Sequence, residues 1–124
     1  GYADGYQRHW DVFMRKIEPI AKRVPYMTTP GNHEFWFNFT AYKARFQMPK
    51  YQEYESMHWS LELGPLHMMA MNTESVLDTS NLDQAQRKWI DEDLTSVNQR
   101  RSSVPWVIAT GHRPFYCGDH NKKD

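Results

Sequence analysis

The second half of the chain alternates between strand-like and helix-like patterns, and this order restricts the possible folds more than any other feature. Residues 57–63 alternate between apolar and polar side chains, which predicts a strand with one buried face. Residues 66–71 are mostly apolar and predict a second strand, buried on both faces. Residues 82–99 carry apolar side chains at the helical period, and residues 104–110 form a further strand-like run. This strand–helix–strand order predicts an α/β layered fold.

The first half of the chain has weaker patterns. Between residues 6 and 24, apolar residues recur at spacings of three and four, which predicts a helix that Pro19 should kink or end early. Residues 24–29 contain β-branched residues and are stopped by Pro30-Gly31, so a short buried strand is predicted there. Residues 39–46 predict a short helix.

Composition excludes several classes of function. Lys and Arg together number 15, as do Asp and Glu, so the chain has no net charge and no basic excess for binding nucleic acid. No apolar run approaches the roughly 20 residues that a membrane-spanning helix needs. Cys117 is the single cysteine, so a cysteine-rich zinc site is excluded and metal ligands would have to be oxygen and nitrogen donors.

Two short loops carry the side chains that suggest chemistry. They are Gly31-Asn32-His33-Glu34 and Gly111-His112-Arg113-Pro114, and each follows a predicted strand. Glycine allows the backbone to turn sharply at such a point. Ligands of open α/β sheets bind beyond the carboxyl ends of the strands. We therefore expect the two loops to meet at one edge of the sheet.

Asn32, His33 and His112 have side chains suited to phosphoester hydrolysis at a two-metal centre. The Asn32 amide oxygen is a hard ligand for a divalent metal, and His112 could bind the same kind of ion through its imidazole. His33 could protonate a leaving oxygen or stabilise a negatively charged phosphoryl group. Each histidine could equally be a hydrogen-bonded loop residue without a chemical role. Glu34 is expected to orient its loop rather than to bind metal.

Taken together, these motifs resemble those of the purple acid phosphatases, which are calcineurin-like metallophosphoesterases. The first loop matches the family motif GNH[DE], and residues 107–114 resemble the strand and histidine loop that follow it in the family. Tyr2-Ala3-Asp4 looks like the end of the family motif GDxxY. Residues 38–49 and 58–65 also look familial. The resemblance implies an α/β fold that forms part of a calcineurin-like metallophosphoesterase sandwich.

The resemblance implies a role for each matched residue. Tyr2 would bind a ferric ion, Fe(3+), as a phenolate. Asn32 and His112 would share a second, divalent metal, which could be Zn, Fe or Mn. His33 would contact the phosphate and help to protonate the leaving group. A metal-bound hydroxide would attack the phosphate monoester, because coordination lowers the pKa of water toward neutrality.

Three further residues have two interpretations each. Arg113 could bind a phosphate or brace the backbone of its loop. His120 lies where some family members have histidines that face the substrate, and it could instead be an exposed loop residue. Asn38, in Asn38-Phe39-Thr40, fits an N-glycosylation acceptor and fits an ordinary polar loop equally well.

The resemblance also implies that part of the active site lies outside this chain. Three elements of the family pattern do not occur in the sequence: the first aspartate motif (DxG), the bridging aspartate of GDxxY, and the closing GHxH pair. We therefore expect residues 1–124 to be part of a single catalytic domain, truncated at both ends, and inactive by themselves.

The intact protein is expected to be an acid phosphatase that hydrolyses phosphate monoesters. By the same resemblance, we expect it to be a secreted or lysosomal glycoprotein; its oligomeric state is not predicted. Two alternatives remain: a phosphodiesterase or nucleotidase of the same superfamily, and a non-catalytic binding domain. Tyr2 favours the purple enzymes over the first alternative, because the resemblance assigns a tyrosine ligand to them alone.

Overall fold

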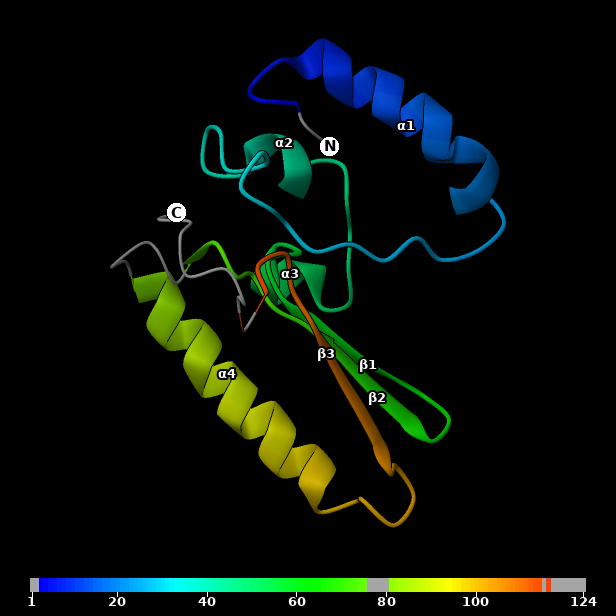
Figure 1. Cartoon of the computed structure of the whole chain (residues 1–124), viewed down its shortest axis with the longest axis vertical. Coiled ribbons are helices and arrows are strands. Elements are labelled where there is room, and N and C mark those ends of the chain that lie inside the picture. The colour runs from blue at the N-terminus through cyan, green and yellow to red at the C-terminus, as the bar shows by residue number, and fades with distance from the viewer. Residues whose placement is uncertain (1–2, 76–80, 115, 117–124) are drawn as a thin grey trace.

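The computed structural model describes residues 3–75, 81–114 and 116, with the backbone alone for 81–83. A three-stranded sheet in the order β1-β2-β3 occupies one half of the molecule (Figure 1). β1 (Trp59–Leu63) pairs antiparallel with β2 (Leu66–Ala70) across a tight turn at Gly64-Pro65. β3 (Trp106–Thr110) pairs parallel with β2. All three strands were predicted from the sequence and lie within the predicted ranges.

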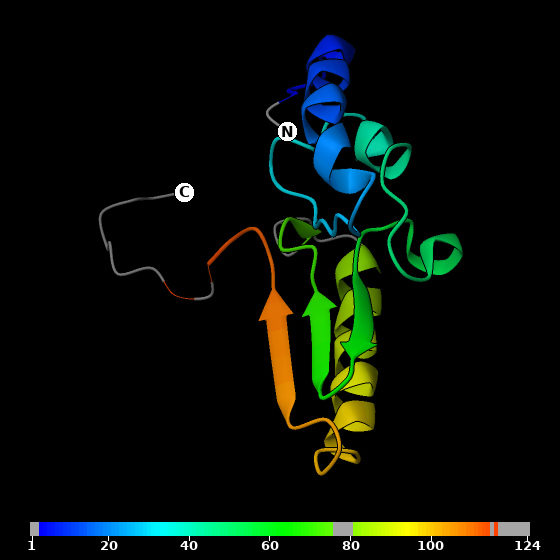
Figure 2. The ribbon, with the colours of Figure 1, turned by 90° about the vertical axis from the view of Figure 1, so that its right-hand side faces the viewer.

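α4 (Asn81–Asn98) connects β2 to β3 and lies along one face of the sheet (Figure 2). Trp89 of this helix packs in a buried cluster with Met69 and Met71. Asp93 adds two hydrogen bonds to the sheet, accepting from Ser60 Oγ at 2.7 Å and from His67 Nε2 at 2.7 Å. The predicted strand–helix–strand unit is therefore confirmed, and it brings the carboxyl ends of β2 and β3 to the same edge.

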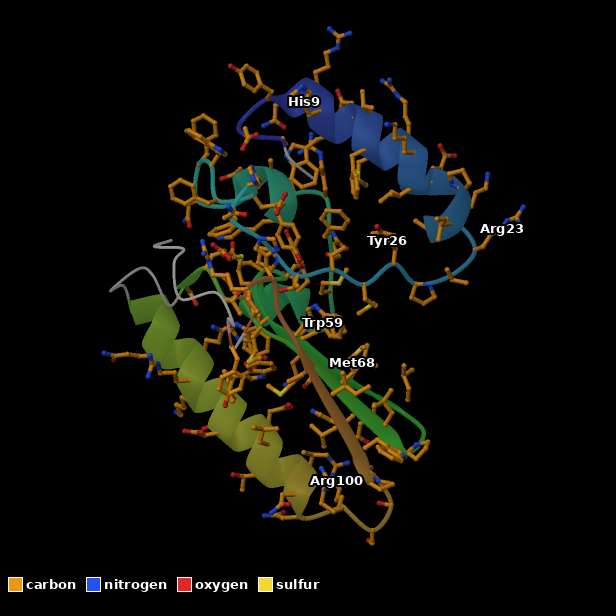
Figure 3. All side chains as sticks on the ribbon, viewed as in Figure 1. His9, Arg23, Tyr26, Trp59, Met68 and Arg100 are labelled. Carbon is orange, nitrogen blue, oxygen red and sulfur yellow. The ribbon has the colours of Figure 1, made fainter. Side chains whose placement is uncertain are left out.

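The other face of the sheet is apolar and is covered at one end only among the described residues, where Trp59 and Ala70 are buried in the core that the N-terminal half forms. Leu63, Trp106 and Ile108 are exposed on it, and Met68 lies on the side away from α4 (Figure 3). A sheet covered by a helix on one face and apolar on the other fits one part of a layered α/β sandwich. No helix among the described residues has both the length and the apolar character needed to cross a bilayer.

The N-terminal half packs beyond the end of the sheet (Figure 1). α1 (Gln7–Ala21) buries Trp10 and Ile17 in a core shared with α2 (Thr40–Lys43) and with the segment that follows α2. Pro19 lies inside α1, and the helix ends shortly after it, at Ala21. The sequence analysis did not predict the short helix α3 (Tyr51–Tyr54).

The strand predicted at residues 24–29 is wrong: the structure shows no regular secondary structure from residue 25 to residue 30. A strand needs a neighbouring strand to satisfy its backbone, and within the described residues this segment is held by side chains instead. Trp59 Nε1 donates to Thr28 O at 2.7 Å, and Thr29 Oγ1 donates to Met71 O at 2.8 Å. Residues 25–30 thus place Gly31 near the end of the sheet without forming backbone pairs with a strand.

Candidate active site

The two predicted loops meet beyond the carboxyl ends of β2 and β3. Asn32 Oδ1 lies 3.0 Å from His112 Nε2, although the residues are 80 positions apart in the sequence. The expectation that these side chains share one edge of the sheet is therefore confirmed.

Met71, directly after β2, joins the segments that carry the two side chains. Its N–H donates to Thr110 O at 2.9 Å, and its carbonyl accepts from Thr29 Oγ1 at 2.8 Å. One backbone unit therefore fixes the end of β3, which leads to His112, relative to the segment that leads to Asn32. The convergence follows from this linkage and does not require a strand at residues 24–29.

Close packing at both loop glycines sets the positions of these side chains. A Cβ atom on Gly31 would lie 2.9 Å from Cγ of His112, and one on Gly111 would lie 2.6 Å from Cγ2 of Thr73. Neither distance is compatible with a larger residue unless its neighbour moves. Glu34 Oε2 accepts from the Gly31 N–H at 3.0 Å, which confirms that Glu34 orients its own loop.

The separation of Asn32 and His112 fits two ligands of one cation. In this structure Asn32 Oδ1 and His112 Nε2 are hydrogen-bonded at 3.0 Å, a separation that two ligands about 2.1 Å from one divalent metal would also have at roughly a right angle. The part of the chain that the structure describes contains no group of three or more His, Cys, Asp and Glu side chains that could hold a metal. Among the described residues, Asn32 and His112 could therefore supply only part of a ligand set. Tyr2 lies outside the described residues.

His33 is held by a carboxylate that the sequence analysis did not predict. His33 Nδ1 lies 2.6 Å from Asp4 Oδ1. Hydrogen bonding from His33 is the largest cause that lowers the pKa of Asp4, and weaker hydrogen bonding from the Trp36 side chain adds to it. The ionised carboxylate can only accept, so Nδ1 carries the proton and donates it to Asp4. Asp4 stands two residues after Tyr2, the tyrosine of the resembling motif, and that position was the only available signal.

Arg113 makes a paired contact with Glu74. Its Nη2 donates to Glu74 Oε2 at 2.9 Å, and its Nε lies 3.1 Å from both carboxylate oxygens. The Arg113 backbone N–H donates to Thr73 Oγ1 at 2.9 Å. Of the two predicted roles, this geometry favours bracing of the His112 loop over phosphate binding. Sequence analysis missed Glu74, whose side chain is buried.

The remaining candidate residues differ in what the structure says of them. Asn38 is exposed, in a turn that precedes α2. The hydroxyl of Thr40, the third residue of the acceptor triplet, donates to Phe37 O. His120 lies outside the described residues.

The chain belongs to the calcineurin-like phosphoesterase family, whose family model matches residues 2–124. It is 44% identical over 117 residues to acid phosphatase type 7 of Homo sapiens, covering 92% of this chain and 26% of that protein. It is 34% identical over 124 residues to purple acid phosphatase 22 of Arabidopsis thaliana, covering 93% of this chain and 27% of the relative.

A third relative, named probable inactive purple acid phosphatase 9 of Arabidopsis thaliana, is 30% identical over 154 residues, covering 99% of this chain and 23% of its own length. The chain thus spans about a quarter of the length of these relatives. The resemblance to purple acid phosphatases is confirmed by these matches, and the calcineurin-like α/β fold agrees with the mixed sheet and its covering helix.

Proposed function

We propose that this chain is part of the single catalytic domain of an acid phosphatase that hydrolyses phosphate monoesters with Fe(3+) and a divalent metal. One observation carries the proposal: Asn32 Oδ1 and His112 Nε2 converge at 3.0 Å beside His33, which is bonded to Asp4. A pair of neutral metal ligands next to an oriented histidine provides two functions that phosphoester hydrolysis needs. In this proposal Tyr2 binds the ferric ion, while Asn32 and His112 bind the divalent ion.

His33 would act on the leaving group, while Tyr2, Asn32 and His112 would hold the metals. When bound, the two metals supply an activated water and stabilise negative charge on the phosphoryl oxygens. His33, oriented through Nδ1 by Asp4, would transfer a proton from Nε2 to the ester oxygen as the bond from phosphorus to that oxygen breaks. The products are inorganic phosphate and the free alcohol. Arg113 would hold the His112 loop through Glu74, and a contact between His120 and the substrate remains part of the proposal.

The non-catalytic alternative keeps some support, because one relative is named probable inactive. In that case the same fold would bind a ligand or partner without turnover. The phosphodiesterase or nucleotidase alternative would keep Asn32, His33 and His112 but would not need a phenolate at Tyr2. Metal content, colour and substrate preference together separate the three possibilities.

The test uses the full-length protein that contains this chain. We expect bound iron with a second metal, hydrolysis of p-nitrophenyl phosphate at a rate well above that of bis(p-nitrophenyl) phosphate, and a visible absorption band that the Tyr2→Phe variant loses. Faster hydrolysis of the diester, or an unchanged band in the variant, would support the other enzymes of the superfamily. Metal binding without hydrolysis of either ester would support the binding domain.

We further propose that the protein is exported to the cell exterior or to lysosomes and carries a glycan on Asn38. The exposure of Asn38 and the triplet that it begins support this assignment. Enzymatic removal of N-glycans should shift the mass of the protein expressed in a eukaryotic secretion system. The Asn38→Gln variant should lose one glycan, and an unchanged mass in this variant would rule out modification at Asn38.

A further inference from the structure

Three consecutive aromatic side chains lie exposed just after His33. Phe35, Trp36 and Phe37 are 59%, 46% and 72% exposed. Phe39, in contrast, is buried in the core and anchors the end of this loop. Contiguous exposed apolar side chains often mark a binding site, whereas single ones need no explanation.

These rings lie beside the proposed proton donor. A Cβ atom on Gly5 would lie 3.7 Å from the Trp36 ring and 3.6 Å from the Phe37 ring, so both rings cover the backbone of Gly5. Gly5 directly follows Asp4, which is bonded to His33 at 2.6 Å. The aromatic loop and the Asp4–His33 pair are therefore adjacent in space as well as in sequence.

The backbone conformation of residues 37–39 keeps the neighbouring aromatic rings exposed. Phe37, Asn38 and Phe39 have φ values of 55°, 54° and 58°, in the left-handed region that non-glycine residues seldom adopt. Such strain persists only where the surroundings impose it. Here Phe39 is buried, and its ring makes an edge contact with Phe35 at a centroid distance of 6.4 Å. Phe39 thus anchors the loop in the core, while Phe35, Trp36 and Phe37 remain exposed.

We propose that Phe35, Trp36 and Phe37 form an aromatic subsite for the leaving group, so that the preferred substrates are aryl phosphate monoesters. This inference rests on the proposed phosphatase function. A residue that protonates the leaving oxygen has to lie next to it, so the group attached to that oxygen must lie near the residues that flank His33. Aromatic rings stack favourably on one another, and a planar aryl group suits this surface better than a flexible polar alcohol.

The experiment compares two substrates whose leaving alcohols have similar acidity, phenyl phosphate and hexafluoroisopropyl phosphate, in the full-length protein. We expect the native protein to prefer phenyl phosphate in kcat/KM. Trp36→Ala should reduce this preference about 10-fold, mainly through KM for the aryl ester. Trp36→Phe keeps a ring and loses the indole N–H, so it should retain most of the preference.

Two outcomes would overturn the subsite. Equal loss on both substrates in Trp36→Ala would mean that Trp36 only supports Asp4 and His33, or is covered by another part of the protein. An unchanged ratio would mean that the rings do not contact the leaving group. Trp106→Ala, the same substitution at the opposite end of β3, should leave the ratio unchanged whatever it does to stability. Failure of the native protein to hydrolyse either ester would contradict the proposed function itself.

Discussion

Gly31 leaves no room for a side chain next to His112, because a Cβ atom there would lie 2.9 Å from Cγ of the imidazole ring. The two residues belong to loops that meet only in the folded chain, so this contact fixes the distance between the proposed metal ligands. Glycine at this position is therefore explained by packing against His112, the proposed metal ligand, rather than by an unusual backbone angle.

The first prediction follows from this contact. Gly31→Ala should displace the His112 ring and lower both turnover and divalent-metal content of the full-length protein. A displacement near 1 Å commonly costs about 10²-fold in rate. Gly111→Ala serves as a comparison, because a Cβ atom there would lie 2.6 Å from Thr73 Cγ2 and a second substitution can remove this clash. Thr73→Ser removes that methyl group but keeps the hydroxyl that accepts from Arg113.

Metal content decides whether the Gly31 interpretation is right. If Gly31→Ala retains native metal content and native turnover, the ring of His112 has another position available and the packing argument fails. For Gly111→Ala, the added Thr73→Ser substitution should restore most of the activity. A double variant no better than the single one would show that the Thr73 methyl group is not the obstacle.

The second prediction separates metal ligands from the proton donor. Asn32→Ala and His112→Ala should each lower the content of one metal, because each removes a proposed direct ligand. His33→Ala should leave the metal content nearly unchanged and reduce turnover by about 10²–10⁴-fold, the usual contribution of general acid catalysis. Elemental analysis of the purified variants alongside steady-state kinetics makes the comparison. Loss of metal from His33→Ala would identify it as a ligand instead.

The third prediction concerns Asp4, the partner of His33. Asp4→Asn should lower turnover about 10–100-fold, the range typical of residues that orient a functional side chain through a hydrogen bond. The loss should be larger for alkyl phosphates than for p-nitrophenyl phosphate, because a poor leaving group depends more on protonation. Asp11→Asn, an exposed carboxylate on α1, is the control. Equal losses on both substrates would assign Asp4 a purely structural role.

Hydrophobic periodicity made β1 and α4 predictable, and short runs rich in apolar residues made β2 and β3 predictable. The meeting of Asn32 and His112 was also predictable, although one premise was wrong. Residues 24–29 do not form a strand, and side-chain bonds from Trp59 and Thr29 perform the positioning that a ladder was expected to provide.

Asp4 and Glu74 could not be recognised in the same way. Both are single acidic residues outside the regular elements, and each finds its partner far along the chain, 29 residues away for Asp4 and 39 for Glu74. Such pairings depend on how two loops approach each other. The approach of two loops leaves no periodic pattern in the sequence. Only the folded chain therefore shows that Asp4 contacts His33 and that Glu74 contacts Arg113.

The fourth prediction concerns the Arg113–Glu74 pair. The Glu74 side chain is 7% exposed, so removing its partner leaves a buried carboxylate without compensation. Arg113→Met should lower the free energy of unfolding by about 1–3 kcal/mol. Adding Glu74→Gln to Arg113→Met should recover part of the loss, because the buried charge is then gone. Urea denaturation of the native protein, the two single variants and the double variant gives the coupling energy between Arg113 and Glu74. If the losses of stability in the two single variants simply add up in the double variant, the pair does not stabilise the loop.

The fifth prediction concerns the pH dependence of stability and rests on His58. Its ring packs against those of Tyr54 and Trp89, with centroid distances of 4.4 Å to each, and those two rings are 6.1 Å apart. Burial there lowers the pKa of His58 to about 4, from 6.5 in the unfolded chain. The unfolded state therefore binds a proton more readily than the folded state. Stability from the neutral ring is fully present above pH 6.5 and is lost as the pH falls toward about 4.

His58→Phe keeps an aromatic ring in the stack and removes the titrating group. We expect the variant to lose less stability than the native protein between pH 6.5 and pH 4, the two pKa values of His58, by on the order of 1–3 kcal/mol. Urea denaturation at several pH values within this window measures the difference. Carboxylates remote from His58 contribute equally to both proteins and cancel, whereas Glu53, whose charge raises the pKa of His58 against the effect of burial, contributes to the difference itself. Parallel pH profiles for the two proteins would show that His58 becomes protonated in the fold as readily as in the unfolded chain, and that the aromatic stack does not exclude the charge.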